Sequence, residues 1–145
     1  MVPNLKILVE AKGRAIWSIP SDATVFDAIT LMAEKGIGLL LVRDDPHALP
    51  AGVISERDYA RKIILQGRKS RDTAVADVMT RNLTYGKPDQ TVYEGMGLMT
   101  EGRFRHLPVL EDGKVLGILS IGDLVKAVIE DQQFRIEQLE DYISS

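Results

Sequence analysis

Cysteine is absent from this 145-residue sequence. Its absence excludes disulfide bonds, thiolate catalysis and zinc sites with cysteine ligands, and it leaves the redox compartment undetermined. Aromatic residues are scarce, at 6% of the chain, so the core that its 45% of apolar residues can form is mainly aliphatic. No apolar run approaches the about 20 residues of a membrane span, and the N-terminus lacks a signal-peptide core. We therefore expect a cytoplasmic protein with no membrane segment.

A large charge of one sign is absent as well, because the formal net charge is only −3. A chain with this balance has no general attraction to nucleic acid or to an anionic membrane. The P-loop and the glycine-rich dinucleotide motif, two fingerprints of nucleotide-binding enzymes, are also missing. We expect no nucleic-acid partner, although a local basic patch would be compatible with this composition.

One seven-residue motif is present twice. Residues 52–58 read Gly-Val-Ile-Ser-Glu-Arg-Asp, and residues 117–123 read Gly-Ile-Leu-Ser-Ile-Gly-Asp. In both copies a glycine and two apolar residues are typical of the end of a buried strand, and Ser-x-x-Asp then leads into a helical pattern. Two copies of one strand–turn–helix junction indicate two copies of one structural unit.

The helix that precedes each motif repeats too. Thr24 with Asp27, and Thr91 with Glu94 67 residues later, form capping-box patterns that predict helix starts. Each pair is followed by an apolar stripe at helical spacing, and Gly36 ends the first of these helices.

The strands complete the repeat. Continuous apolar runs at residues 39–42 and 107–110 predict strands covered on both faces. The two motif copies are 65 residues apart, and the two-residue difference from the helix spacing lies in the loops at 43–51 and 110–116. A short strand is expected at 15–19, whereas residues 4–10 fit either a strand or a helical turn.

Each repeat is too small to be stable alone, so we expect the two to share a buried face as one module. The expected boundaries are 1–14 for an N-terminal segment, 15–66 for the first repeat, 67–79 for a connector with a short helix at 73–79, 80–130 for the second repeat and 131–145 for a C-terminal helix.

The C-terminal helix carries a regular apolar pattern. Its members are Val125, Ile129, Ile136, Leu139 and Ile143, at alternating spacings near three and four, with Gln132 as a polar interruption. This spacing is typical of a coiled-coil seam, although the same stripe could pack on the protein's own core. Because the helix outlasts its repeat, we favour self-association.

The Ser-x-x-Asp turns have a structural explanation, since both residue types cap helix N-termini. Their repetition adds a second interpretation: two hydroxyls, two carboxylates and two helix N-termini beside a shared cleft. Helix N-termini attract phosphate, and a carboxylate can accept hydrogen bonds from a ribose diol. This combination favours a nucleotide ligand.

Basic residues occur near both motifs. Arg103, Arg105 and His106 precede the second apolar strand, and Arg57 lies inside the first motif. Arginine donates in a planar fork and protonated histidine donates as a cation, so these side chains suit phosphate oxygens. The alternative is a solvated basic turn, and we favour the ligand role for Arg105 and His106.

Together these residues resemble a tandem pair of CBS domains, the cystathionine-β-synthase type. The resemblance rests on Val-x-x-Ala-x-x-x-Met at residues 25–32, Arg-His-Leu-Pro-Val at 105–109 and the doubled Gly-x-x-Ser-x-x-Asp motif. Residues 55–61 and 138–143 further resemble stand-alone bacterial two-domain members of the family. The similarity covers nearly the whole chain.

The resemblance implies an α+β fold, in which two β-α-β-β-α repeats form a pseudo-twofold module that binds adenine nucleotides and dimerises into a flat disc. It assigns ribose hydroxyls to Asp58 and Asp123, and phosphates to Ser55, Arg57, Arg105, His106 and Ser120. It places the adenine beside Thr80 and a strand of Thr84, Tyr85 and Gly86, with Lys12, Gly13, Ser18 and Ile19 as the counterparts in the first repeat. Gly38 and Leu39 stand where the second repeat has Arg105 and His106, so the two sites are expected to differ.

We therefore expect a non-catalytic regulatory homodimer that senses AMP, ADP, ATP or NAD and signals to a separate effector protein. It would need no metal and no catalytic cofactor. One alternative is a small phosphohydrolase using His106 or the carboxylates of residues 44–47, which could also seed a metal site, although a turn explains them better. Another is a protein- or nucleic-acid-interaction module without a nucleotide, built on the basic residues between 57 and 71.

Overall fold

The computed structural model describes residues 2–13 and 15–144. The chain divides into two compact units. One consists of residues 15–83 and is called the first-repeat unit here; the other combines residues 1–14 with 84–145 and is called the second-repeat unit. The N-terminal segment thus belongs to the unit that contains the second motif.

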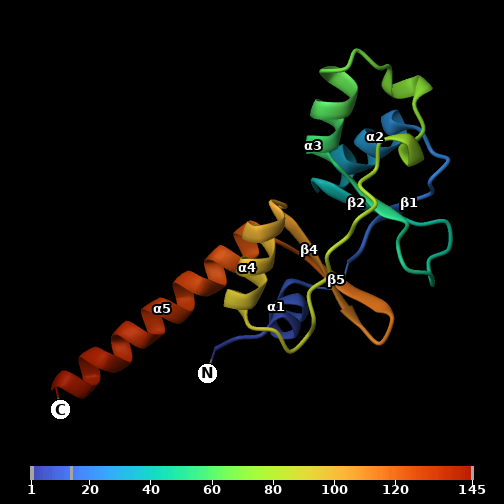
Figure 1. Cartoon of the computed structure of the whole chain (residues 1–145). Helices are drawn as coiled ribbons and strands as arrows, with labels where there is room; N and C mark the ends of the chain where they lie inside the picture. Colours follow the sequence, from blue (N-terminus) through green and yellow to red (C-terminus); the bar gives the residue numbers. More distant parts are fainter. Residues whose placement is uncertain (1, 14, 145) are drawn as a thin grey trace. The chain divides into compact units, whose positions relative to one another are not determined.

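The first-repeat unit is built around a three-stranded sheet in the order β1-β2-β3. Strand β1 (Ser18–Ile19) pairs in parallel with β2 (Leu39–Val42), and β2 pairs antiparallel with β3 (Gly52–Ser55). Helix α2 (Val25–Lys35) connects β1 to β2 (Figure 1). After β3 the chain forms the single turn α3 (Glu56–Asp58) and continues as the π-helical turn η1 (Tyr59–Ile64).

Two 3-10 turns complete this unit: η2 (Ser70–Asp72) and η3 (Val75–Asp77). Val75, Val78 and Met79 are buried in the same core as Val25 and Leu40. The helix expected at 73–79 is therefore only one 3-10 turn, and its apolar side chains pack in the first-repeat core. The chain then runs beside β3, where Val53 and Thr80 exchange backbone hydrogen bonds of 2.9 and 2.8 Å.

The second-repeat unit contains an antiparallel hairpin of β4 (His106–Glu111) and β5 (Lys114–Ser120), with a bulge between Val109 and Leu110. Helix α4 (Val92–Gly102) precedes the hairpin and α5 (Ile121–Ser144) follows it. Helix α1 (Leu5–Lys12), from the N-terminus, packs on this hairpin. Gly86 forms an isolated parallel bridge with Val109, so the strand expected at 84–86 is reduced to one bridge residue.

The N-terminal helix is part of the second-repeat core. Leu5 and Val9 of α1 are fully buried together with Val92, Leu107 and Leu119. A Cβ atom at Gly117 of β5 would lie 2.6 Å from a Val9 methyl group, so α1 and β5 can approach this closely only with glycine at that position. Apolar burial of this kind is the main stabilising term, and it determines that residues 5–12 are helical.

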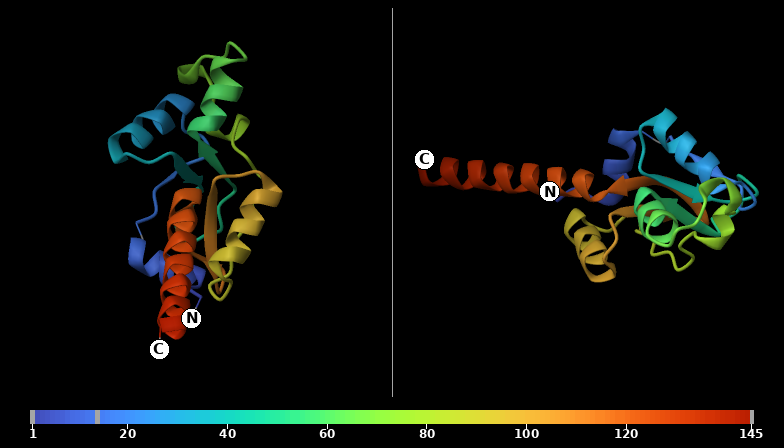
Figure 2. Two further views of the ribbon diagram at one scale, coloured as in Figure 1. Left: turned by 90° about the vertical axis from the view of Figure 1, so that its left-hand side faces the viewer. Right: turned by 90° about the horizontal axis from the view of Figure 1, so that it is seen from above.

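The predicted helix starts are confirmed. Thr24 caps α2 and Thr91 caps α4, each in a complete capping box with its acidic partner three residues later. Helix α2 ends at Gly36 in the left-handed conformation, which glycine adopts without a steric penalty. Helix α5 is long, and its C-terminal half extends beyond α1 and α4 of its own unit (Figures 1 and 2).

Candidate functional site

Both copies of the motif form the same strand–helix junction. Ser55 ends β3 and caps α3: its hydroxyl accepts from the Asp58 amide at 3.2 Å, and Asp58 Oδ2 accepts from the Ser55 amide at 3.0 Å. Ser120 ends β5, where its hydroxyl accepts from the Asp123 amide at 3.1 Å and Asp123 Oδ2 accepts from its amide at 2.7 Å. The helix-cap interpretation is therefore correct for both motifs.

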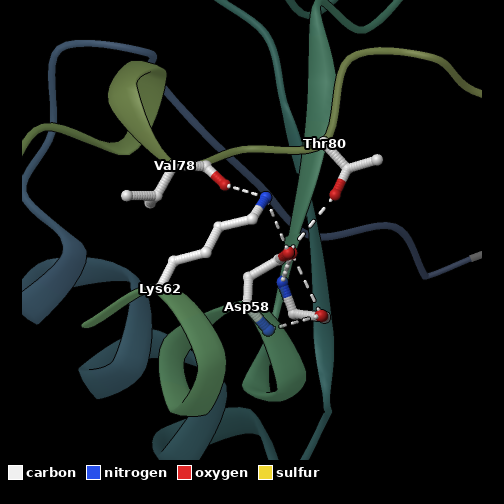
Figure 3. Close-up of polar contacts among 5 residues, drawn as sticks. Asp58, Lys62, Val78 and Thr80 are labelled. Atoms are coloured by element: carbon white, nitrogen blue, oxygen red, sulfur yellow. Dashed lines mark hydrogen bonds and ion pairs between the residues drawn. The ribbon is translucent and has the colours of Figure 1, made fainter. Parts of the chain in front are cut away.

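In the first-repeat unit the second oxygen of Asp58 is engaged as well. Oδ1 accepts from the Thr80 hydroxyl at 3.2 Å and faces the Lys62 ammonium at 3.2 Å (Figure 3). Lys62 also donates to the Val78 carbonyl at 2.7 Å. The Asp58 carboxylate is mostly buried among these groups, and both of its oxygens have protein partners.

In the second-repeat unit the Asp123 carboxylate has different hydrogen-bond partners. Lys12 donates to Oδ2 of Asp123 at 2.6 Å and to the Ile118 carbonyl at 3.0 Å. Burial acts to raise the pKa of Asp123, but hydrogen bonds from Lys12 and Ser120 and the charge of Lys12 outweigh it, so the pKa lies below its ordinary value. Within the described residues, nothing donates to Oδ1 of Asp123. One oxygen of an ionised carboxylate is thus left to accept a hydrogen bond.

The strand register brings the predicted phosphate residues of the second repeat together. His106 is the cross-strand partner of Ser120, and the Arg105 carbonyl accepts from the Ile121 amide at 2.8 Å. These residues therefore lie at the same end of the hairpin as Asp123, where β5 passes into α5. Two basic side chains, a hydroxyl and a carboxylate are brought to one strand–helix junction.

The first repeat has the same register without the basic residues. Leu39 is the cross-strand partner of Ser55, and the Gly38 carbonyl accepts from the Glu56 amide at 3.1 Å. A Cβ atom at Gly38 would lie 3.7 Å from the carboxyl carbon of Glu56. An acidic side chain is thus present where the second repeat has Arg105. The sequence correspondence of Gly38 and Leu39 with Arg105 and His106 is confirmed by these contacts.

Some of the residues expected to border the adenine do not lie in the units to which the resemblance assigns them. Ser18 and Ile19 form β1 of the first-repeat unit, as expected. The resemblance assigns Lys12 and Gly13 to the first repeat, but they lie in the second-repeat unit, and Lys12 contacts Asp123. Conversely, Thr80 lies in the first-repeat unit and contacts Asp58.

The remaining candidates have less defined surroundings. Arg57 is exposed on α3 and Thr84 is exposed before Gly86, which is buried. Tyr85 is half-buried, and burial raises the pKa of its hydroxyl. The side chains of Arg57 and Thr84 therefore have room to contact a bound molecule, whereas Gly86 offers only its backbone.

Two polar features were not recognised in the sequence. Lys62 follows Asp58 by four residues, a spacing that favours an ion pair on a helix and could have revealed it. Asp131 is buried, accepts from the Tyr93 hydroxyl, and pairs with Arg135 at 3.0 Å, while Gln132 donates to Tyr93 at 2.8 Å. Gln132, the polar interruption in the α5 stripe, therefore helps to hold α5 against α4 through its hydrogen bond to Tyr93.

The carboxylates of residues 44–47 form a turn. Asp44 accepts from the amide and hydroxyl of Ser21 at 2.9 and 3.0 Å, and Asp45 accepts from the His47 amide at 2.8 Å. In the described part of the chain, no group of three or more His, Asp or Glu side chains could hold a metal ion. No helix among those residues has both the length and the apolar character needed to cross a membrane.

Comparison with known sequences identifies a family and its relatives. A family model for the CBS domain matches residues 13–65 and 75–130, most of the chain. The mitochondrial CBS domain-containing protein CBSX3 of Arabidopsis thaliana is 41% identical over 92% of this chain and 66% of its own length. CBSCBSPB3 of the same plant is 36% identical over 83% of this chain, but this chain spans only 22% of it. The chain thus covers less than two thirds of either relative.

Solved structures with the same fold include a protein with CBS domains from Burkholderia ambifaria, 51% identical, with a TM-score of 0.83 over 89% of this chain and 96% of that one. A hexameric CBS-CP12 protein from bloom-forming cyanobacteria is 27% identical, with a TM-score of 0.77 over 86% and 71% of the two chains. The CBS domain pair of MJ0100, in complex with 5′-methylthioadenosine and S-adenosyl-L-methionine, is 21% identical, with a TM-score of 0.77 over 90% and 99%.

Proposed function

The chain belongs to the CBS-domain family, and we propose that it is a non-catalytic regulatory module that senses adenine nucleotides such as AMP, ADP, ATP or NAD. The observation that carries this proposal is the junction at Ser120 and Asp123. There an ionised carboxylate keeps one oxygen without a donor among the described residues, next to a helix N-terminus. A ribose hydroxyl is a suitable donor for that oxygen, and a phosphate suits the neighbouring helix N-terminus.

The side chains around Asp123 support a phosphorylated ligand. His106, the first residue of β4, pairs with Ser120, and Arg105 directly precedes it. Arginine recognises phosphate oxygens through its planar fork. The MJ0100 domain pair, which has the same fold, was solved with two adenosine-derived molecules, and this supports adenosine as the common part of the ligand. We assign ribose recognition to Asp123 and phosphate recognition to Arg105, His106 and Ser120.

We further propose that occupancy is passed on to an effector protein and that the chain acts as a homodimer. A ligand changes a conformational equilibrium only through unequal affinity for two states, so the nucleotide must bind one arrangement of the units more tightly. The Burkholderia ambifaria neighbour carries a provisional description as a signal-transduction protein, and the CBS-CP12 protein is hexameric. Both support a regulatory, self-associating protein.

Calorimetric titration tests the proposed ligand. Purified chain, stripped of nucleotide, is titrated with AMP, ATP and NAD, with GTP as the control for the base. We expect saturable binding of an adenine nucleotide, weaker binding of GTP, and no product after prolonged incubation. If no adenine nucleotide binds, the sensor function is refuted; if a bound nucleotide is hydrolysed, the non-catalytic assignment is wrong.

A further inference from the structure

Helix α5 exposes an apolar stripe. Ile129, Ile136, Leu139 and Ile143 are between 47% and 79% exposed. The opposite face of α5 is occupied in its first half, where Leu124 and Ala127 are buried in the second-repeat core. The stripe is thus an exposed apolar face on a helix whose first half packs in its own unit, and exposed apolar surface of this kind marks interaction sites.

The same part of α5 is strongly acidic. Between residues 130 and 141 there are five acidic side chains and one basic side chain, a net charge of −4. Glu130, Glu137 and Glu140 each follow a stripe residue by one position, so they line one edge of the apolar stripe. Any partner of this face must therefore be apolar in the middle and basic at the edge.

The first-repeat unit has a surface with that composition. Phe26, Ile64 and Leu65 are between 38% and 78% exposed, and Phe26 and Ile64 line an open groove of about 460 Å³. Arg68 and Lys69 contribute to the wall of this groove. The Arg71 guanidinium lies 3.9 Å from the centre of the Phe26 ring. The charged side chains that line the groove are Arg68, Lys69, Arg71 and Asp72, three basic and one acidic, a net charge of +2.

We propose that this groove binds helix α5 from a second copy of the chain, with the apolar stripe of α5 in the groove and its acidic edge against the basic rim. An amphipathic helix lying in an apolar groove with a complementary rim is a common mode of recognition. Pairing of α5 with α5 of another copy is less favourable, because it brings two segments of charge −4 together. A reciprocal contact between two copies covers both grooves and both helices in a closed dimer.

This proposal specifies the contact of the proposed homodimer and does not depend on nucleotide binding. Charge reversal tests it, using the full chain and sedimentation equilibrium at low ionic strength. Arg68→Glu with Lys69→Glu reverses the groove rim, and Glu137→Lys with Glu140→Lys reverses the helix edge. We expect each double variant alone to dimerise about tenfold more weakly or worse, because each opposes like charges in both contacts.

Mixing the two double variants gives the sharpest result. In the mixed dimer one contact joins a reversed groove to a reversed helix, and the other joins two unchanged surfaces. Both contacts are then attractive, so the mixture should dimerise about as tightly as the wild-type chain. The quadruple variant should also recover dimerisation, because its groove and helix are both reversed.

Three outcomes would overturn the proposal. A monomeric wild-type chain would refute self-association itself. Dimerisation that is unchanged in the groove variant but changed in the helix variant would instead assign the contact to pairing of two α5 helices. Failure of the mixture to dimerise, with both variants folded by circular dichroism, would refute the groove–helix contact.

The controls are Lys114→Glu and Glu101→Lys, exposed charge reversals outside both surfaces, which should leave the dimer unchanged. Nucleotide titration of every variant keeps this test separate from the sensor function. A variant that loses dimerisation and retains nucleotide binding supports the contact without bearing on the ligand.

Discussion

The Asp58 and Asp123 junctions share one backbone design and differ in what surrounds the carboxylate. Asp58 has protein donors on both oxygens, from its own cap and from Thr80 and Lys62. Among the described residues, the donors to Asp123 are the Ser120 amide and Lys12, both on Oδ2, and Asp123 lies beside a strand that begins with His106. The same motif therefore has partners on both carboxylate oxygens in one unit and, within the described part of the chain, hydrogen-bond donors on one oxygen in the other.

The largest expected effect separates these two carboxylates. Asp123→Ala should weaken binding of the adenine nucleotide by about 1.5–3 kcal/mol, roughly 10- to 150-fold, the range for hydrogen bonds to a charged group. Asp58→Ala is the matched control and should change the affinity much less. Calorimetric titration of both variants makes the comparison. Equal losses in two folded variants would show that the junctions do not differ in function.

A second comparison concerns the residue two positions after each helix-capping threonine. Phe26 of α2 is covered by Arg71, whereas Tyr93 of α4 donates to Asp131 of α5. The Tyr93 hydrogen bond is the main reason that the pKa of Asp131 lies below its ordinary value. The hydroxyl therefore joins two helices in the second-repeat unit, and the first-repeat unit has no counterpart.

Tyr93→Phe makes the second repeat resemble the first. It leaves the buried Asp131 with one partner fewer, so the melting temperature should fall by several degrees. The pKa of Asp131 is lower in the folded chain than in the unfolded chain, so its ionised form stabilises the fold at pH values above the unfolded pKa. The loss of stability in the variant should therefore be greatest near neutral pH and should shrink as the pH falls through the pKa of Asp131 in the folded chain. Tyr85→Phe is the control, since its hydroxyl makes no hydrogen bond to the described residues. Identical melting of the two variants would contradict the role of Tyr93.

A smaller effect tests whether the partners of Asp58 keep a ligand from binding at that carboxylate. Thr80→Val removes one donor to Asp58 without changing the side-chain shape, so a ribose hydroxyl can take its place. On an Asp123→Ala background, adenosine affinity should rise by about 2- to 10-fold, the value of one net hydrogen bond. Thr100→Val, at an exposed position of α4, is the control. A fall in affinity would mean that Thr80 itself helps to bind the ligand.

The local elements could be predicted because their causes are local. The capping boxes at Thr24 and Thr91, the helix end at Gly36 and the apolar strands each depend on residues within a few positions. The sequence of residues 4–10 fits either a strand or a helical turn, although Asn4, whose side chain accepts from the Ile7 amide, is a recognisable helix cap. Its helical state depends on burying Leu5 and Val9 against residues far along the chain.

The candidate site was predicted to the level of the motif but not of the partners. The Ser-x-x-Asp caps and the correspondence of Gly38 and Leu39 with Arg105 and His106 could be predicted from the repeat. The pairing of His106 with Ser120 is known only from the structure. Lys12 lies 111 positions from Asp123, and Thr80 lies 22 positions from Asp58, so no periodic pattern connects either pair. The family resemblance assigns Lys12 to the first repeat and Thr80 to the second, whereas in the structure Lys12 contacts Asp123 and Thr80 contacts Asp58.

The smallest expected effect concerns the ion pair between Lys12 and Asp123. The lowered pKa of Asp123 means that its pair with Lys12 stabilises the folded chain fully above the ordinary pKa of an unfolded aspartate. That contribution is lost as the pH falls through the lower, folded value. Since Lys12 and Asp123 are 44% and 30% exposed, solvent screening limits the pair to about 0.2–1 kcal/mol.

Lys12→Met should therefore lower the free energy of unfolding near neutral pH and leave it unchanged at pH values where Asp123 is protonated. Thermal melts across this range give the difference from wild type, with Lys87→Met as the control for loss of an exposed charge. A difference that stays constant as the pH falls would mean that the Lys12 stem, rather than its charge, secures α1. A difference that vanishes in acid would identify the Asp123 carboxylate as the group that joins the N-terminal helix to the second repeat.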